Sequence, residues 1–261
     1  MRRQLVLIKL GGSLITDKRK PFTINKGNVE FFTNEFADVR REFQETDFII
    51  GTGAGSFGHF TAHKYGLRKG ARTQEQIYGM CVTHNDVQKL SNMVAESLTM
   101  CNVPVFTMSP SSMLISDNGV ITASCLDPVK KLLGRQVIPL LHGDMLCDNL
   151  RGASVLSTEE LLLECVRAFR DTYRTILVVY LLDSDGVLDQ NGIAIPKLGN
   201  ESSFKLHGTL DHDVTGGMTG KIESARKTAQ IADAVYLISG KQSGALKRVI
   251  LGKNTGTRII L

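Results

Sequence analysis

The chain has 261 residues, a length that fits one large α/β domain or two small ones. Apolar residues make up 42% of it and charged residues 22%, which predicts a folded protein with a sizeable core and excludes a disordered one. The net charge is only +5 and the longest purely basic stretch is residues 18–20, so no nucleic-acid partner is expected.

The cysteines and the apolar runs bear on the compartment. The five cysteines are widely spaced, with no Cys-x-x-Cys pair, and indicate neither a disulfide framework nor a zinc site. Free thiols are typical of a reducing compartment. The apolar run at residues 5–8 is too short for a signal peptide, and the run at 176–182 is far below membrane-spanning length. We therefore expect a cytoplasmic protein without a membrane partner.

Predicted strands and helices alternate through the first half of the chain. Residues 5–10 predict a buried strand, and apolar residues at three- and four-residue steps predict a helix over 26–45 with Asn25 as its N-cap. A short strand follows at 47–50. Thr73 and Gln76 form a capping box at the start of a long helix. The stripe expected on that helix consists of Ile77, Met80, His84, Val87, Ser91, Val94 and Leu98.

The second half continues the pattern. Strands are predicted at 103–106, 137–141, 175–182, 234–238 and 258–261, with a small hairpin turning at Gly119. Ser157 and Glu160 form a second capping box, and a further helix is expected over about 219–232. The alternation indicates a mostly parallel sheet covered on both faces. We predict one α/β domain over residues 1–261, with a lobe for one ligand at about 1–150 and a lobe for another at about 151–261.

Four Gly-rich elements follow predicted strands or open helices, where ligands bind in open α/β sheets. The first is Lys9-Leu10-Gly11-Gly12-Ser13. A lysine inside an apolar strand needs a partner, and a bound phosphate would supply one beside Gly-Gly. The alternative is an edge-strand lysine that extends into solvent.

The second element, residues 53–59, ends at His59 and matches Gly-x-Gly-x-x-Gly. A dinucleotide-binding fold is therefore an alternative. The acidic residue that such a fold needs about twenty positions later would be Glu75, which falls in a predicted helix cap. This places a nicotinamide enzyme well behind other interpretations.

The third and fourth elements lie later in the chain. Residues 182–187, with Asp183 and Asp185, would by themselves indicate an acidic turn. Residues 213–221 resemble a P-loop, but only three residues separate Gly216 from Gly220, and Ile222 replaces the required Ser/Thr. Lys221 is expected in the first turn of a helix, where a cation is unfavourable unless an anion lies nearby.

Taken in this order from Lys9 to about Ala232, the four elements resemble the amino acid kinase superfamily. Residues 55–59 and 213–221, with Ile15-Thr16-Asp17-Lys18, are similar to the isopentenyl phosphate kinases. The fosfomycin kinases share the histidine and much of the pattern. The resemblance implies an open αβα sandwich, a homodimer, ATP with Mg²⁺ as donor, and a small-molecule isoprenoid phosphate as acceptor.

The resemblance also implies roles for individual residues, none of them as a metal ligand. The residues implied as catalytic are Lys9, Lys18, His59 and Lys221. Those implied in ATP binding, with the glycines supplying backbone N–H groups, are Lys9, Gly11, Gly12, Ser13, Gly55, Asp183, Asp185, Gly217 and Lys221. Those implied in acceptor binding are Gly53, Ala54, Gly58, His59 and Gly143.

Two departures from the family pattern and two rival functions remain. Ala54 replaces a glycine of many members, which is harmless if that position needs no positive φ. Glu159 stands where many members have an aspartate that organises the lysines, so it either reaches the same place or the role is lost. The rivals are a fosfomycin-type phosphonate kinase and a nucleotide-binding protein without catalysis. A tail pocket could come from Ile77, Met80 and His84, which could equally be core or dimer interface.

Overall fold

The computed structural model describes residues 2–199 and 217–261, with the side chains of Arg2 and Arg3 left out. The strands of the main sheet are β1 Arg2–Leu10, β2 Thr46–Thr52, β3 Val105–Thr107, β6 Ile138–His142, β9 Tyr173–Leu182, β10 Lys197–Leu198, β11 Ala234–Ser239 and β12 Thr257–Ile259. They lie in the order β10-β12-β11-β9-β1-β2-β6-β3. Only β11 and β12 pair antiparallel. The predicted, mostly parallel sheet is confirmed.

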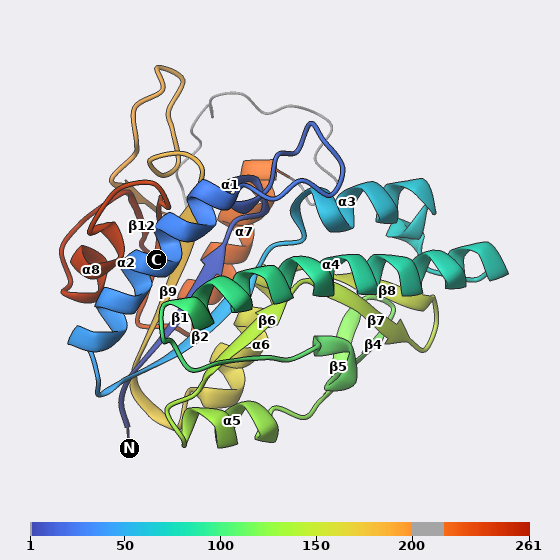
Figure 1. The fold of residues 1–261 in the computed structure, drawn as a ribbon, viewed down its shortest axis with the longest axis horizontal. Helices are drawn as coiled ribbons and strands as arrows, with labels where there is room; N and C mark the ends of the chain where they lie inside the picture. Colours follow the sequence, from blue (N-terminus) through green and yellow to red (C-terminus); the bar gives the residue numbers. More distant parts are fainter. Residues whose placement is uncertain (1, 200–216) are drawn as a thin grey trace.

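Helices cover both faces of this sheet (Figure 1). They are α1 Gly12–Ile15, α2 Lys26–Glu42, α3 Gly55–Lys64, α4 Gln74–Met100, α5 Asp127–Leu133, α6 Thr158–Phe169, α7 Gly217–Ala229 and α8 Ala245–Ile250. Residues of α1, α2, α4 and α8 share one core cluster, and residues of α5, α6 and α7 share the other. The αβα sandwich is therefore confirmed. Within the described residues, none of these helices combines the length and the apolar composition that crossing a membrane requires.

Strand β1 shows how the sequence produces two cores. Leu5 and Leu7 pack into the cluster under α6 and α7, whereas Val6, Ile8 and Leu10 pack into the cluster under α2 and α4. Successive side chains of a strand point to opposite faces, so a strand buried on both sides has to be apolar at every position. Lys9 is the exception, and it falls on the α6 face.

A second, four-stranded sheet lies along the N-terminal half of α4 (Figure 1). Its strands are β4 Leu114–Asp117, β5 Val120–Ser124, β7 Asp144–Asp148 and β8 Gly152–Leu156, in the order β5-β4-β7-β8. The hairpin predicted at Gly119 is its β4–β5 turn, with Gly119 at φ 81°. The remaining strands were not predicted, because their short, mixed sequences carry no clear alternation.

Helix caps followed the sequence more closely than helix faces did. The side-chain oxygen of Asn25 accepts the N–H of Asn28, and both predicted capping boxes are present. On α4, however, Ile77 is 42% exposed and the inward side begins at Gly79 and Thr83. A Cβ on Gly79 would lie 2.3 Å from the ring of Tyr65, so the face of α4 that contains Gly79 packs closely against the protein there.

Asp148 joins the two turns of the second sheet. Its carboxylate accepts hydrogen bonds from the hydroxyl of Ser116 and from the backbone N–H groups of Asn118, Gly119, Leu150 and Arg151. Burial alone would raise the pKa of Asp148, but these donors, led by the N–H groups of Arg151 and Gly119, hold it far below the ordinary range. Asp148 therefore stabilises the fold as a carboxylate.

Replacing Asp148 with asparagine should lower the free energy of unfolding by about 1–3 kcal/mol at pH 7, because an NH2 group then replaces one of the two oxygens that accept hydrogen bonds and faces other donors. Since the folded pKa is depressed, this contribution is complete above the ordinary carboxyl pKa of about 4 and is lost as the pH falls below it. Urea unfolding of wild type, Asp148→Asn and the exposed control Asp171→Asn from pH 7 to pH 3 measures this. A wild-type advantage that stays constant down to pH 3 would contradict the assignment.

Candidate functional site

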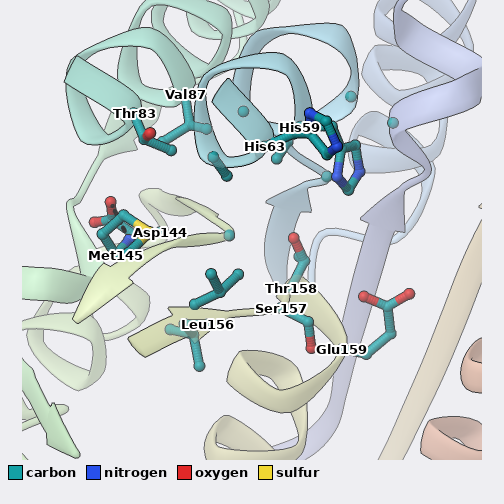
Figure 2. A pocket seen from close by; sticks show the side chains of 18 of the residues that line it. His59, His63, Thr83, Val87, Asp144, Met145, Leu156, Ser157, Thr158 and Glu159 are labelled. Carbon is teal, nitrogen blue, oxygen red and sulfur yellow. Dashed lines mark hydrogen bonds between the residues drawn. The ribbon is translucent and has the colours of Figure 1, made fainter. Parts of the chain in front are cut away.

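Strands β1, β2 and β6 are parallel neighbours, so the loops after Leu10, Thr52 and His142 meet at one edge of the sheet. A cavity of about 460 Å³ opens at this edge. Figure 2 shows part of its lining, with His59 and His63 on α3 facing the first turn of α6. The predicted site residues that line the cavity are Lys9, Gly12, Ser13, Lys18, Gly53, Ala54, Gly55, Gly58, His59, Gly143 and Lys221.

Lys9 and Glu159 form a buried ion pair on the floor of the cavity. Lys9 is 5% exposed and donates to Oε1 of Glu159, which is 9% exposed. The lysine nitrogen also lies 5.9 Å from the ring centroid of Tyr180 on the neighbouring strand. Lys9 is therefore not an edge-strand lysine extending into solvent. Although Glu159 is one methylene longer than the aspartate of the family pattern, it also contacts the lysine.

The charge of Glu159 depends on the lysines around it. Burial alone would raise the pKa of Glu159, but the charge and the hydrogen bond of Lys9 lower it, and the charge of Lys221 lowers it further. Glu159 is thus a carboxylate that faces two of the predicted catalytic lysines. The Ser157–Glu160 capping box was the sequence signal for it, because it sets a helix N-terminus at this edge of the sheet.

The glycines after the strands divide into two kinds. The N–H groups of Gly11, Gly53 and Gly143 donate to the carbonyls of Leu181, Leu10 and Thr52, at 3.0, 2.8 and 3.1 Å. These N–H groups extend the hydrogen bonding of the sheet. The N–H of Gly11, which the resemblance assigns to ATP, is therefore already bonded to the adjacent strand. Gly11 instead permits close packing, since a Cβ there would lie 2.8 Å from the carbonyl oxygen of Leu181.

Other N–H groups lie at helix starts. Gly12 begins α1 and Gly55 begins α3. In α3 the N–H of Ser56 is bonded to Thr16 and those of Phe57 and Gly58 to the carbonyl of Ala54, so an anion at this end would be favoured mainly by the helix dipole. Ala54, just before α3, is at φ −62°, so the departure from glycine there creates no strain. Gly55 is at φ 50° and takes the left-handed position. The N-terminus of the ten-residue helix α3 therefore opens onto the cavity and favours an anion.

The sequence predicts only a Gly-rich loop at residues 53–59. The structure has helix α3 there, and this helix carries His59 to the cavity. A Cβ on Gly58 would lie 2.7 Å from Val87, so this glycine lets α3 pack closely against α4. The hydroxyl of Thr61 donates to the buried carboxylate of Asp86 at 2.9 Å and joins the same two helices. These contacts hold α3 against α4 and thereby position His59 at the cavity.

Lys18 and Lys221 come from distant parts of the sequence, and both line the cavity. Lys18 lies in the exposed segment between α1 and α2. Lys221 is in the second turn of α7 rather than the first, because the helix begins at Gly217. Its side chain donates to the carbonyl of Gly217 at 3.1 Å. The predicted motif residues 213–216 lie outside the described residues.

The remaining predicted ATP ligands lie outside this cavity. Asp183 follows β9 at the same sheet edge and forms an exposed ion pair with Lys241. Asp185 is exposed in the same turn, and Gly217 begins α7 at φ 57°. They lie towards the β9 and β11 side of the edge, whereas the cavity lies over β1, β2 and β6.

The far part of the cavity is apolar, and of the two interpretations of Ile77, Met80 and His84 the structure does not favour a tail pocket. Ile77, Met80 and His84 do not line it. Thr83 and Val87 of α4 line it instead, together with residues of the second sheet. The lining residues here are Ala62, Thr83, Val87, Met145, Val155 and Leu156.

A buried acid supports this apolar wall. Asp144 accepts from the backbone N–H of Met145 and of Ser111, and it pairs with Nδ1 of His84 at 2.8 Å. The hydrogen bond to Asp144 raises the pKa of His84, whereas burial lowers the pKa of His142 behind it. In Figure 2, Asp144 and Met145 lie beside Thr83, on the side of the cavity away from Glu159.

Across residues 2–199 and 217–261, no group of three or more His, Cys, Asp or Glu side chains is arranged to hold a metal ion.

Comparison with known proteins identifies the family to which this fold and site belong. The family model of the amino acid kinase family matches residues 4–239, and the chain belongs to that family. Among its relatives are isopentenyl phosphate kinases from Methanothermobacter thermautotrophicus, 30% identical, and Methanocaldococcus jannaschii, 27% identical. Each alignment covers 98% of both chains. A solved isopentenyl phosphate kinase structure superimposes with a TM-score of 0.79 at 26% identity, covering 98% of this chain and all of the other.

Glu159→Gln should lower the free energy of unfolding by about 3 kcal/mol, because it leaves the Lys9 charge buried without a counter-ion. ATP should raise the melting temperature of this variant more than that of the wild type, since phosphates then supply the missing negative charge. Differential scanning fluorimetry with and without ATP measures both effects. The control is Glu223→Gln, which removes an exposed pair with Lys227 and should cost well under about 1 kcal/mol. Equal ATP shifts in Glu159→Gln and wild type would contradict contact between Lys9 and the nucleotide.

Proposed function

We propose that this protein transfers the γ-phosphoryl group of ATP to isopentenyl phosphate, producing isopentenyl diphosphate and ADP. One observation carries the proposal: a single cavity joins a cationic end, with Lys9, Lys18 and Lys221, to an apolar end of limited size. Two phosphate groups can meet at the first end while a short hydrocarbon tail occupies the second. The kinases of isopentenyl phosphate among its relatives have the same fold.

The acceptor phosphate is assigned to the start of α3. Gly53, Ala54, Gly58 and His59 line this part of the cavity, with Gly143 beside them. A helix N-terminus and an imidazole donor both favour a dianion. A phosphate monoester is already mostly dianionic at pH 7, with a second pKa of about 6, so it attacks without a general base. The His84–Asp144 pair is accordingly not assigned a catalytic role.

The donor phosphates are assigned to the lysine end. Lys9, Gly12, Ser13 and Lys221 would contact the ATP phosphates, and Lys18 would contact the group in transfer. Bringing two polyanions together is the main difficulty of this reaction, and fixed cations oppose that repulsion. Mg²⁺ accompanies ATP in the proposal and would neutralise charge on the phosphate oxygens. An ion-paired, anionic Glu159 would hold Lys9 in place and attract Lys221.

The nucleoside is assigned to the part of the sheet edge over β9 and β11, near Asp183, Asp185 and Gly217. This agrees with a division in which residues of about 1–150 bind the acceptor and residues of about 151–261 bind ATP. The acceptor tail is assigned to the wall formed by Thr83, Val87 and the second sheet. Pairing of Glu159 with Lys9 removes the main reason for favouring a non-catalytic nucleotide-binding protein.

The assembly and the compartment are also proposals. A homodimer is supported by exposed apolar side chains at Met93 and Met100 of α4 and at Phe106 of the edge strand β3. A cytoplasmic location is supported by the five cysteines, all of which are free thiols. Light scattering of the purified chain tests the first.

The first experiment measures ADP release with Mg²⁺ and ATP for isopentenyl phosphate, ethyl phosphate and fosfomycin. Isopentenyl phosphate should be the best acceptor. Ethyl phosphate should have a kcat/KM lower by on the order of 50-fold, because about 0.8 kcal/mol is lost for each of three missing carbons in the apolar end. Omitting Mg²⁺ should abolish turnover. Turnover of fosfomycin alone would retain phosphoryl transfer but overturn the acceptor.

His59→Ala should reduce kcat/KM for isopentenyl phosphate by about 10- to 100-fold, because a charge-assisted donor to the acceptor phosphate is lost. His59→Asn, which keeps an N–H donor, should recover part of the loss. His63→Ala, one turn further along α3 and exposed at the rim, should cost much less. An undiminished kcat/KM in His59→Ala would overturn this role.

A further inference from the structure

The two glycine loops proposed to hold donor and acceptor touch each other directly. A Cβ on Gly12 would lie 2.6 Å from both the backbone nitrogen and the Cα of Gly55. A Cβ on Gly53 would lie 2.7 Å from the nitrogen of Gly12. The loop after β1 and the loop before α3 therefore pack backbone against backbone. Their separation, which would set the distance between the two phosphates, depends on whatever holds them together.

The hydroxyl of Thr16 provides that connection. It donates to the carbonyl of Gly12 at 2.7 Å and accepts the backbone N–H of Ser56 at 2.9 Å. Thr16 is 3% exposed. A Cβ on Gly55 would lie only 2.3 Å from the Oγ1 of Thr16, so a side chain larger than that of glycine would clash with it. A single buried oxygen thus joins the first loop to the first turn of α3, three residues before His59.

Ser56 extends the connection to the segment that carries Lys18. Its carbonyl accepts the N–H of Phe22 at 3.3 Å, and its hydroxyl accepts the N–H of Thr23 at 3.2 Å. Asp17 and Thr23 are joined by a backbone hydrogen bond of 2.9 Å, which closes this segment between α1 and α2 into a short hairpin. In Figure 1 the blue segment between α1 and α2 reaches towards α3.

A buried threonine usually does no more than satisfy a nearby carbonyl within its own helix, as Thr83 does with Gly79. Thr16 makes the same local bond to Gly12, four residues before it, but its hydroxyl also accepts the N–H of Ser56, forty residues away in sequence. Three segments meet at this point, and each carries a side chain or N–H group assigned to a different phosphate. A local capping role would connect only one of them.

We propose that Thr16 and Ser56, the Thr16–Ser56 latch, are positioning residues that fix the donor loop, the acceptor loop and Lys18 relative to one another. The inference rests on the proposed phosphoryl transfer between the two loops. In-line transfer requires the reacting oxygen and phosphorus to be held close and aligned, and a displacement of about 1 Å can cost on the order of 100-fold in rate. Loss of the latch should therefore act on turnover rather than on the binding of either substrate alone.

The kinetic test compares Thr16→Val, which removes the hydroxyl while keeping the shape, with Thr16→Ser, which keeps the hydroxyl. Thr16→Val should lower kcat by about 10- to 100-fold, while the dissociation constants of ATP and of the acceptor, each measured alone by calorimetry, change less than about threefold. Thr16→Ser should stay within about threefold of the wild type. The matched control is Thr33→Val, which removes a buried hydroxyl bound to Ser97 between α2 and α4, far from the loops.

A second readout does not depend on the substrate. Hydrogen–deuterium exchange of Thr16→Val should be faster at Ser56, Phe22 and Thr23, with no change in the α2 and α4 peptides. If the wild type does not phosphorylate isopentenyl phosphate, the proposed function fails. The exchange pattern needs no substrate and therefore still tests the latch. Unchanged exchange at Ser56, unchanged kcat, or a kcat loss matched by Thr33→Val would each overturn it.

If Thr16→Val does not fold, Ser56→Ala takes its place, because it removes only the hydroxyl contacts with the Lys18 hairpin. It should lower kcat by at least about fivefold and speed exchange at Thr23. A Ser56→Ala variant with wild-type kcat and exchange would overturn the latch.

Discussion

Placing the Lys9 charge under the sheet edge is the constraint on which the rest of the site depends. A buried ammonium group requires an anion, and the α6 helix brings Glu159 to it from a distant part of the sequence. That requirement fixes where α6 begins and therefore where the floor of the cavity lies. In the proposed reaction the phosphates would meet a lysine that is already oriented, so little reorganisation would accompany phosphoryl transfer.

Much of the fold could be predicted because its signals are local. Asn25, Thr73 and Ser157 each start a helix through a hydrogen bond made within three residues. The central strands β9 and β11 are apolar at most positions, as burial on both faces requires. By contrast, the second sheet depends on contacts with α4 and on the Asp148 carboxylate, which no short window of sequence reveals.

The candidate site divides in the same way. Lys9, His59 and Lys221 could be assigned because each stands next to glycines in a recognisable order. The apolar wall could not, because it depends on which face of α4 turns inward, and that face begins at Gly79, where Tyr65 packs closely. The hydrogen bond from the N–H of Gly11 to β9 was hidden for a related reason, because spacing shows that a glycine is present but not which group its N–H contacts.

The N–H groups of Gly11, Gly53 and Gly143 donate to adjacent strands. The hydrogen-bond pattern of the sheet therefore continues past the ends of the strands into the loops. The floor under the reacting groups is consequently part of the most cooperative unit of the molecule rather than a set of independent loops. Such a floor loses little conformational entropy when a ligand arrives, so more of the contact energy remains as affinity. Adaptation to acceptors of different shape then falls to the wall built by α4 and the second sheet, which can change without disturbing the phosphate end.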